Sequence, residues 1–179
     1  MASKGNAQLK KLNTGAREFS GACVVIVKTE WNAEIVDELE NGCRKILEKK
    51  GVKMIDTITV PGAVEIPFGI KSYWDSVKYK DDRPLAFIAL GCVIKGDTPH
   101  FDYVCQSVTA GISHLNMQLP IPVIFGILTV NNEQQALDRI GGSEGHKGEE
   151  AGITALKMIA LLNHLKETDE CAAVHTMFR

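Results

Sequence analysis

The chain of 179 residues has few aromatic residues, no long apolar segment and no strong charge of either sign. Its longest apolar run, residues 121–130, contains Pro122 and is too short to cross a bilayer, so we expect no membrane span. The formal net charge of −2 gives no electrostatic reason to expect nucleic acid or an anionic membrane as a partner. The first 17 residues carry four basic side chains and no acidic one but lack an apolar core, so we expect no secretory signal.

The cysteines are odd in number and have no motif. There are five of them, and none stands in a C-x-x-C spacing. This pattern argues against a disulfide framework and against a zinc site, so we expect no metal. It favours reduced thiols and a cytoplasmic protein.

Four apolar, β-branched runs predict buried strands, and each is followed by a segment with helical spacing. The predicted strands cover residues 22–27, 55–60, 85–93 and 122–128. The predicted helices cover the stripe Ile35–Leu47 and residues 65–79, 99–117, 132–140 and 147–164. Alternation of this kind predicts an α/β fold, in which a four-stranded parallel sheet is flanked by helices. We expect one domain over residues 21–164, with an N-terminal arm over 1–20 and a C-terminal tail over 165–179.

The distinctive residues of the chain follow its strands, where ligands bind in such sheets. They are Trp31 and Asn32 after the first strand, residues 61–65 after the second, residues 96–100 after the third, and Arg139 and Lys147 after the fourth. Phe125 lies within the fourth strand. We therefore expect the chemistry to gather on one rim of the sheet.

The turn after the third strand is the most informative part. Thr98 is a good N-cap, Pro99 suits the first helical position, and Gly96 opens the loop before them. Free backbone N–H groups at this helix start predict an anion site. His100 follows inside the helix, and imidazole is the side chain best suited to proton transfer near neutral pH. The combination predicts an enzyme that acts on a phosphorylated small molecule.

Several of these residues also have a structural interpretation. Trp31 can be a core aromatic, although a strand-to-helix turn favours stacking on a planar ring. Glu65 can be a helix-start residue favoured by the dipole or can bind ligand hydroxyls and amines, and the two interpretations stay open. Arg139 and Lys147 can be solvated charges or phosphate ligands. Cys92 is better interpreted as a small strand-end side chain than as one half of a thiol–imidazole pair.

Two apparent phosphate-loop signals fail. Gly91 and Gly96 have P-loop spacing, but Asp97 stands where the phosphate-binding lysine belongs. The glycine-rich stretch 141–148 follows a helix instead of a strand, so it is not a dinucleotide fingerprint.

Four ordered motifs resemble the lumazine synthase family, over a region from about residue 21 to residue 164. They read VPGAVEIP at 60–67, GCVIKGDTPHFDY at 91–103, PVIFG at 122–126, and EQQA at 133–136 followed by Arg139 and by KG at 147–148. The resemblance implies a three-layer flavodoxin-like fold. It also implies the penultimate step of riboflavin biosynthesis, in which 5-amino-6-(D-ribitylamino)uracil and 3,4-dihydroxy-2-butanone 4-phosphate give 6,7-dimethyl-8-ribityllumazine, phosphate and water. No cofactor is implied.

The resemblance also implies a role for each matching residue. His100 would move protons. The pyrimidine and its ribityl chain would contact Trp31, Asn32, Ala63, Val64, Glu65, Cys92, Val93, Ile94, Phe125 and Lys147. The phosphate would bind at Gly96, the backbone of Asp97, Thr98 and Arg139. Family members form pentamers, some of which build 60-subunit shells, so the active sites would lie between subunits.

Two rival functions stay open. A flavin- or lumazine-binding shell protein without catalysis would bind the pyrimidine and not turn it over, although the presence of His100 and Arg139 argues against it. A flavodoxin-like electron carrier would need a Ser/Thr-rich phosphate loop after the first strand, which this chain lacks.

Overall fold

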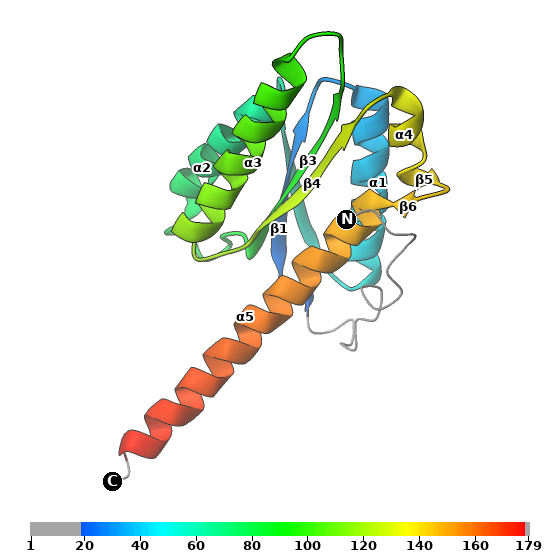
Figure 1. The fold of residues 1–179 in the computed structure, drawn as a ribbon. Coiled ribbons are helices and arrows are strands. Elements are labelled where there is room, and N and C mark those ends of the chain that lie inside the picture. Colours follow the sequence, from blue (N-terminus) through cyan, green and yellow to red (C-terminus); the bar gives the residue numbers. More distant parts are fainter. Residues whose placement is uncertain (1–18, 178–179) are drawn as a thin grey trace.

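The computed structural model describes residues 19–177, with side chains for residues 19–168. The central sheet has four strands, which are β1 (Cys23–Thr29), β2 (Met54–Val60), β3 (Ala86–Ile94) and β4 (Val123–Val130). Their order across the sheet is β2-β1-β3-β4, and each neighbouring pair is parallel (Figure 1). The four-stranded parallel sheet predicted from the sequence is confirmed.

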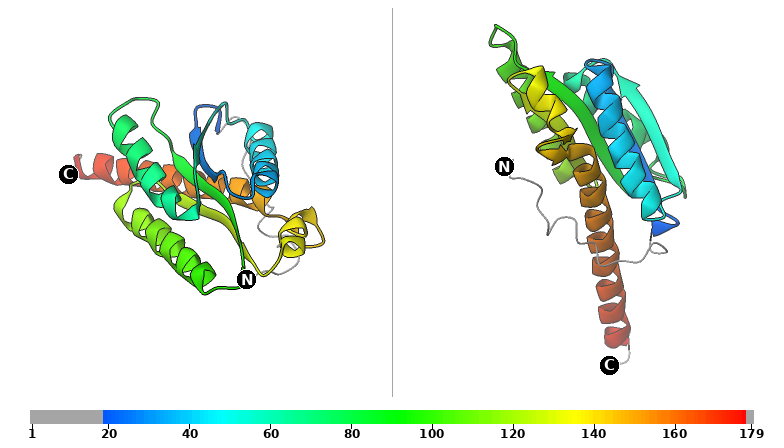
Figure 2. Two further views of the ribbon diagram at one scale, coloured as in Figure 1. Left: turned by 90° about the horizontal axis from the view of Figure 1, so that it is seen from above. Right: turned by 90° about the vertical axis from the view of Figure 1, so that its right-hand side faces the viewer.

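Helices cover both faces of this sheet. The helices α1 (Ala33–Lys49) and α5 (Lys147–Met177) pack on one face, and α2 (Ile66–Val77) and α3 (His100–Gln118) pack on the other (Figure 1 and Figure 2). Along β1, Val24 and Ile26 belong to the first core, and Val25 and Val27 to the second. Because both faces are buried, the strands read as continuous apolar runs instead of alternating ones. The three-layer flavodoxin-like fold is therefore confirmed.

The direction in which the chain moves across the sheet reverses between β1 and β3. From β1 the chain passes through α1 to β2, and from β3 it passes through α3 to β4 on the opposite side. The two strands pair directly, with Lys28 near the end of β1 opposite Leu90 in the middle of β3. The connections diverge at this point, so the fold opens a crevice there for a ligand.

The start of α3 differs from the prediction. The helix begins at His100, and Pro99 occupies the N-cap position with φ −62° and no side-chain hydrogen bond. The backbone N–H of Asp102 donates to the Pro99 carbonyl at 3.0 Å. The N-cap predicted at Thr98 falls one residue later, at Pro99, although Pro99 already has helical dihedral angles; because proline has no side-chain acceptor, no side-chain hydrogen bond caps the helix.

The segment after β4 also differs. The short helix α4 covers only Glu133–Leu137, and an antiparallel pair follows, made of β5 (Ile140–Gly142) and β6 (Gly145–His146). We predicted a helix over 132–140 and a plain glycine-rich connection. Gly141 and Gly145 have φ of 122° and 80°, which glycine adopts without strain and which lets the chain reverse here.

The last helix continues into the predicted C-terminal tail, which the mix of charged and small residues there also allows. It runs to Met177 instead of ending at residue 164, because no glycine or proline follows Gly152 to end it. Residues 1–18 lie outside the described residues. The division into an arm, a domain and a tail therefore stays a prediction.

A buried carboxylate joins α1 to the sheet. The Glu40 side chain is 12% exposed, and its Oε2 lies 2.7 Å from Lys28 Nζ of β1. Its Oε1 accepts hydrogen bonds from Arg44 Nε at 2.7 Å and from the Thr57 hydroxyl of β2 at 2.8 Å. Burial opposes ionisation, but the three donors outweigh it and hold the Glu40 pKa below its usual value. The ionised carboxylate therefore stabilises the contact between α1, β1 and the edge strand β2.

We expect Glu40→Gln to lower the free energy of unfolding by about 1–3 kcal/mol at pH 7, since three donors lose a charged acceptor. A depressed pKa adds stability above the unfolded value, and this stability is lost as the pH falls through the folded value. The difference between variant and parent should therefore shrink below about pH 4. Urea denaturation at one protein concentration measures it, with Glu48→Gln on the same helix as control. A difference that persists unchanged into acid would contradict the assignment.

Candidate active site

The turn after β1 projects an aromatic ring over the carboxyl end of the sheet. The Trp31 side chain is 73% exposed, but its backbone is held tightly. The N–H of Glu30 donates to the Val60 carbonyl at 2.9 Å, and the N–H of Trp31 donates to the Pro61 carbonyl at 3.3 Å. The Thr29 hydroxyl donates to the Trp31 carbonyl at 3.1 Å. The exposure of the ring is against the interpretation of Trp31 as a core aromatic. Its stacking on a flat ligand stays a prediction.

Asn32 joins this turn to β3. It adopts left-handed dihedral angles, φ 57° and ψ 43°, at the start of α1, and its side chain does not cap the helix. The Asn32 amide instead donates to the Cys92 carbonyl at 2.8 Å. Asparagine tolerates this backbone conformation better than most residues. The hydrogen bond fixes the turn that carries Trp31 relative to the end of β3.

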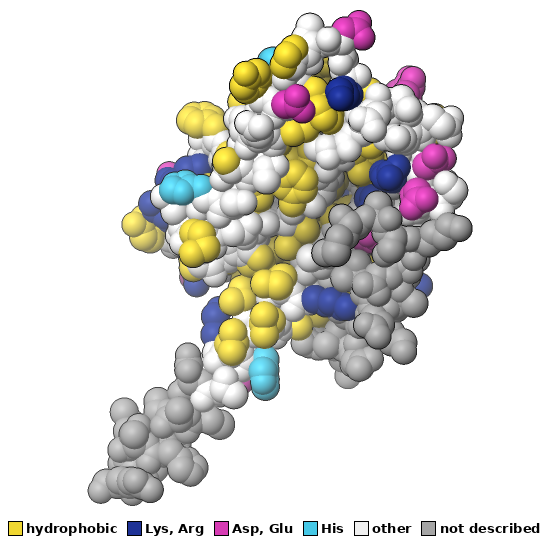
Figure 3. Space-filling model, viewed as in Figure 1, with side chains coloured by type: hydrophobic (Ala, Val, Ile, Leu, Met, Phe, Trp, Pro, Cys, Tyr) yellow, Lys and Arg dark blue, Asp and Glu magenta, His cyan; other side chains and the backbone are white. Residues whose placement is uncertain are grey.

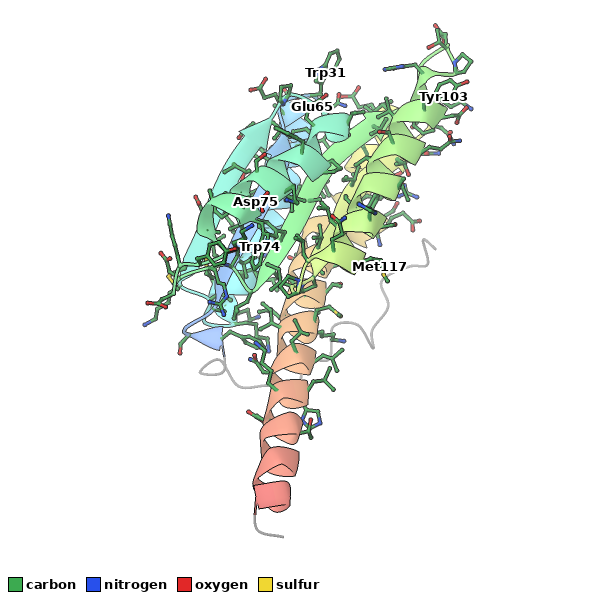
Figure 4. The ribbon with its side chains drawn as sticks, turned by 90° about the vertical axis from the view of Figure 1, so that its left-hand side faces the viewer. Trp31, Glu65, Trp74, Asp75, Tyr103 and Met117 are labelled. Atoms are coloured by element: carbon green, nitrogen blue, oxygen red, sulfur yellow. The ribbon has the colours of Figure 1, made fainter. Side chains whose placement is uncertain are left out.

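The turn after β2 brings a carboxylate beside the indole. A Cβ placed on Gly62 would lie 3.0 Å from Glu65 Oε2 and 3.8 Å from Trp31 Cδ1, so both side chains border the same small space. Figure 4 shows Trp31 and Glu65 together at one end of the sheet. Glu65 ends a short 3₁₀ turn, η2 (Ala63–Glu65), just before α2. The structure therefore places an exposed carboxylate next to the aromatic platform.

A cavity of about 470 Å³ lies between these turns and the end of β3. His100 lines it from the first position of α3 and is exposed to solvent. The predicted site residues that line it are Trp31, Asn32, Ala63, Val64, Glu65, Cys92, Val93, Ile94 and His100. The sequence analysis assigned no ligand contact to Thr29, Gly62 and Val104, which also line it. Of these three, only Gly62 had a sequence signal for a ligand contact, because it directly precedes the predicted contacts Ala63, Val64 and Glu65 in the same motif.

Cys92 contributes its shape and its carbonyl to this cavity. The side chain is 4% exposed, and burial raises the pKa of its thiol to about 11. A thiol with such a pKa is almost entirely protonated near neutral pH and is a weak nucleophile. The structure therefore supports the interpretation of Cys92 as a small strand-end side chain.

Phe125 and Lys147 line a different hollow. It has a volume of about 530 Å³ and follows the edge of β4, with Asn116 of α3 on one side and Glu150 of α5 on the other. β4 pairs only with β3, so its other edge has no strand beside it among the described residues. Figure 3 shows hydrophobic side chains running along this face over β4 and onto α5. The two groups of predicted site residues therefore lie in separate hollows of one chain.

The cationic residues have partners within the chain. Both carboxylate oxygens of Glu150 accept hydrogen bonds from Lys147 Nζ at 2.9 Å. The sequence analysis missed Glu150, although its i,i+3 spacing from Lys147 was a signal. Arg139 is half-buried between α4 and β5, and its Nη1 donates to the Gln135 carbonyl at 2.8 Å. Neither cation lines the cavity of Trp31 and His100.

The loop before α3 is open. Gly96, Asp97 and Thr98 are all exposed, and Pro99 joins them to His100. They do not line the cavity itself. The structure thus places the predicted phosphate loop next to His100 in the chain, while Arg139 does not line the cavity that His100 lines.

Neither a metal centre nor a membrane segment is found in the described part of the chain. Within residues 19–168, whose side chains are described, no three His, Cys, Asp or Glu side chains are grouped so that they could hold a metal ion. Within the described residues, every helix is too short or too polar to traverse a bilayer.

The sheet order and the cavity at its switch point define a flavodoxin-like α/β protein with a small-molecule site. Residues 21–163 match the family model described as 6,7-dimethyl-8-ribityllumazine synthase, and the chain belongs to this family. The resemblance predicted from the four motifs is confirmed. The family consists of enzymes, and the predicted transferase class is confirmed at this level.

Bacterial relatives support this assignment. A 6,7-dimethyl-8-ribityllumazine synthase of Parabacteroides distasonis is 48% identical over 136 residues, which cover 75% of this chain and 82% of the relative. A protein of the same name from Bacteroides fragilis is also 48% identical over 136 residues, 75% of this chain and 92% of the relative. A third, from Cytophaga hutchinsonii, is 47% identical over 137 residues, 75% of this chain and 83% of the relative.

We expect Cys92 to be alkylated slowly in the native protein. At pH 8 its thiolate fraction should be lower than that of an ordinary cysteine by on the order of a hundredfold. Timed iodoacetamide labelling with peptide mass spectrometry measures the rate, and the same cysteine in the urea-unfolded chain is the control. Fast native labelling would mean an activated thiol and would favour the thiol–imidazole alternative.

Proposed function

We propose that this chain condenses 5-amino-6-(D-ribitylamino)uracil with 3,4-dihydroxy-2-butanone 4-phosphate to form 6,7-dimethyl-8-ribityllumazine, phosphate and water. This is the penultimate step of riboflavin biosynthesis. The observation that carries the proposal is the cavity at the switch point, where an indole, a carboxylate and an imidazole meet in a member of this family. The relatives named above carry the name of the same product.

The cavity suits the pyrimidine substrate. Trp31 offers an exposed ring for stacking, and Val93 and Ile94 offer an apolar wall beside it. Glu65 and the backbone around Ala63 would accept hydrogen bonds from the ribityl hydroxyls and the amino groups. Asn32 would have an indirect role, because its amide is already engaged by the Cys92 carbonyl.

His100 would move the protons. The amine of the pyrimidine attacks the ketone carbonyl, and water leaves as the imine forms. Elimination then releases phosphate and leaves an enol, which tautomerises so that the carbon of the former C3 hydroxyl becomes a carbonyl. The second nitrogen closes the ring onto this new carbonyl with loss of water. Each step needs a proton carried between nitrogen, oxygen and carbon, which an imidazole at the cavity wall can do near neutral pH.

No cofactor and no covalent enzyme intermediate are needed in this proposal. An amine and a carbonyl held at attack distance gain up to about 7–11 kcal/mol from proximity and orientation. The task of the protein is therefore to hold two substrates side by side and to exchange protons with them.

The phosphate would bind at the loop before α3. Gly96, Asp97 and Thr98 can present backbone N–H groups next to the start of this 19-residue helix, where an anion is favoured. Arg139 would complete the site, since a guanidinium matches the geometry of a phosphate. Within one chain Arg139 does not line this cavity. In this proposal it comes from a second copy.

A second copy of this chain is thus part of the proposed site. The open edge of β4 and the apolar hollow beside it are the kind of surface that proteins cover by association. Phe125 on β4 is 42% exposed, and Tyr103 and Met117 on α3 are 68% and 87% exposed (Figure 4). Phe125, Arg139 and Lys147 of one copy would face Trp31 and His100 of the next. We propose a homopentamer, which in this family can also build a 60-subunit shell.

The proposal also covers the domain that carries the reaction and the compartment in which it takes place. We assign catalysis to residues 21–164 and place the protein in the cytoplasm. The four cysteines with described side chains are free thiols, which fits a reducing compartment.

The direct test mixes both substrates with the protein and follows the absorbance of the lumazine product. Turnover supports the proposal. Binding of the pyrimidine without turnover would instead favour a shell protein that has kept the ligand site and lost catalysis.

We expect His100→Ala to lower kcat by about a hundredfold or more while the affinity for the pyrimidine is mostly kept. The reason is that the cavity keeps its aromatic and apolar walls when the proton carrier is removed. Stopped-flow absorbance measures kcat, and calorimetric titration measures the affinity. His164→Ala, an exposed histidine on α5, is the matched control. Unchanged turnover in His100→Ala would remove this residue from the mechanism.

A further inference from the structure

A histidine outside the cavity lies flat against a glycine of α1. A Cβ placed on Gly42 would lie 2.1 Å from His146 Cε1, 2.5 Å from Nδ1 and 2.6 Å from Nε2. Real Cβ atoms do not approach other heavy atoms this closely, so the imidazole occupies the space that any other residue at position 42 would need. Gly42 therefore forms a niche for the ring of His146.

The ring is held there by shape more than by hydrogen bonds. Its Nδ1 accepts a long hydrogen bond from the Glu149 N–H at 3.4 Å. Its Nε2 is buried and has no hydrogen-bond partner among the described residues, and the nearest carboxylate oxygen, Glu38 Oε1 of α1, lies 3.6 Å away. The Glu149 carboxylate is engaged elsewhere, 3.6 Å from Lys45 Nζ of α1. Close packing against α1 thus explains the position of the ring better than a polar contact does.

A second close approach between α5 and α1 lies one turn away along α1. A Cβ placed on Gly148 would lie 2.0 Å from the Leu39 carbonyl oxygen, so the start of α5 touches the backbone of α1. Leu39 and Gly42 are three residues apart and share a face of α1. Residues 146–148 are therefore seated along one face of this helix.

The contact of residues 146–148 with α1 positions the segment that carries both proposed cations. His146 pairs with Ile140 in the β5–β6 hairpin, and the N–H of Lys147 donates to the Arg139 carbonyl at 2.8 Å. Arg139 immediately precedes the hairpin, and Lys147 immediately follows it. A shift of the backbone at His146 would therefore be passed on to the backbone of both cations.

We infer that His146, packed into the Gly42 niche, is a positioning residue that sets where Arg139 and Lys147 stand in the active site. The inference rests on the proposed function for the role of these cations. His146 itself touches neither the cavity of Trp31 nor the hollow of Phe125. Its effect is mechanical, since it acts through the hairpin backbone.

The test is a double-mutant cycle with Gly42→Ala, His146→Ala and the combination of both. Alanine is the better helix former, so Gly42→Ala should stabilise the protein once the ring is gone. With the ring present, the same change should destabilise the protein, because the new methyl group displaces the imidazole. Urea denaturation measures this reversal of sign. Equal effects of Gly42→Ala in both backgrounds would overturn the inference.

The functional arm of the test is the KM for the phosphorylated ketone. We expect His146→Ala and Gly42→Ala each to raise it by about tenfold with a smaller change in kcat, because the cations are displaced while the imidazole of His100 is untouched. The double variant should regain most of the loss, since the methyl group refills the niche. A loss of stability alone would reduce the active fraction, and therefore kcat, without changing KM. His164→Ala is the control.

The two proposals fail in different ways. If Arg139→Ala leaves the KM for the ketone unchanged but the stability reversal holds, the assignment of Arg139 to the phosphate is wrong and the niche remains. If Arg139→Ala raises this KM and His146→Ala does not, the positioning role of His146 is overturned and the proposed function remains.

Discussion

The hydrogen bond from Asn32 to the Cys92 carbonyl is the contact on which the rim of the sheet depends. It joins the ends of β1 and β3, the two neighbouring strands whose connections diverge. Asn32 is the only residue other than glycine with a positive φ among those described, and this conformation turns its amide toward β3 and away from its own helix. The turn with Trp31 and the strand that leads to His100 are thereby fixed relative to one another.

Helix α1 connects this rim to the rest of the molecule. Its first turn begins at Asn32, its middle holds Glu40 in a network with β1 and β2, and its face at Gly42 receives the hairpin through His146. One helix therefore positions both halves of the proposed site. The cavity lies at its start, and the cations lie on the segment packed along its side. In the proposed assembly these two halves would belong to different active sites. A substitution in α1 would therefore alter the geometry of two neighbouring active sites.

The sequence analysis was most successful where one physical cause acts alone. Strands buried on both faces read as apolar runs, and residues that directly follow strands must lie near the carboxyl edge, so the cavity from Trp31 to His100 was predictable. Prediction from neighbouring residues was less exact where two adjacent residues each favour a helix start. Thr98 has the chemistry of an N-cap, but the N-cap position falls at Pro99 and no side chain caps the helix.

Other features had no local signal at all. The β5–β6 hairpin is built on glycines that equally suggest an irregular connection. The niche for His146 depends on Gly42, which lies more than a hundred residues earlier in the chain. The residues next to either of them in the sequence do not indicate this contact. The separation of Phe125 and Lys147 from the cavity follows from β4 being the edge strand, which requires the strand order and not only the strands.

The central claim is that a complete site needs two copies of the chain, and complementation between inactive variants tests it most directly. His100→Ala and Arg139→Ala are unfolded, mixed, refolded together and assayed for lumazine formation, beside each variant refolded alone. The account predicts that the mixture regains activity, because some interfaces then combine an intact His100 from one copy with an intact Arg139 from another. Activity no greater than the sum of the two separate variants would contradict it, since it would mean that each site is made within one chain.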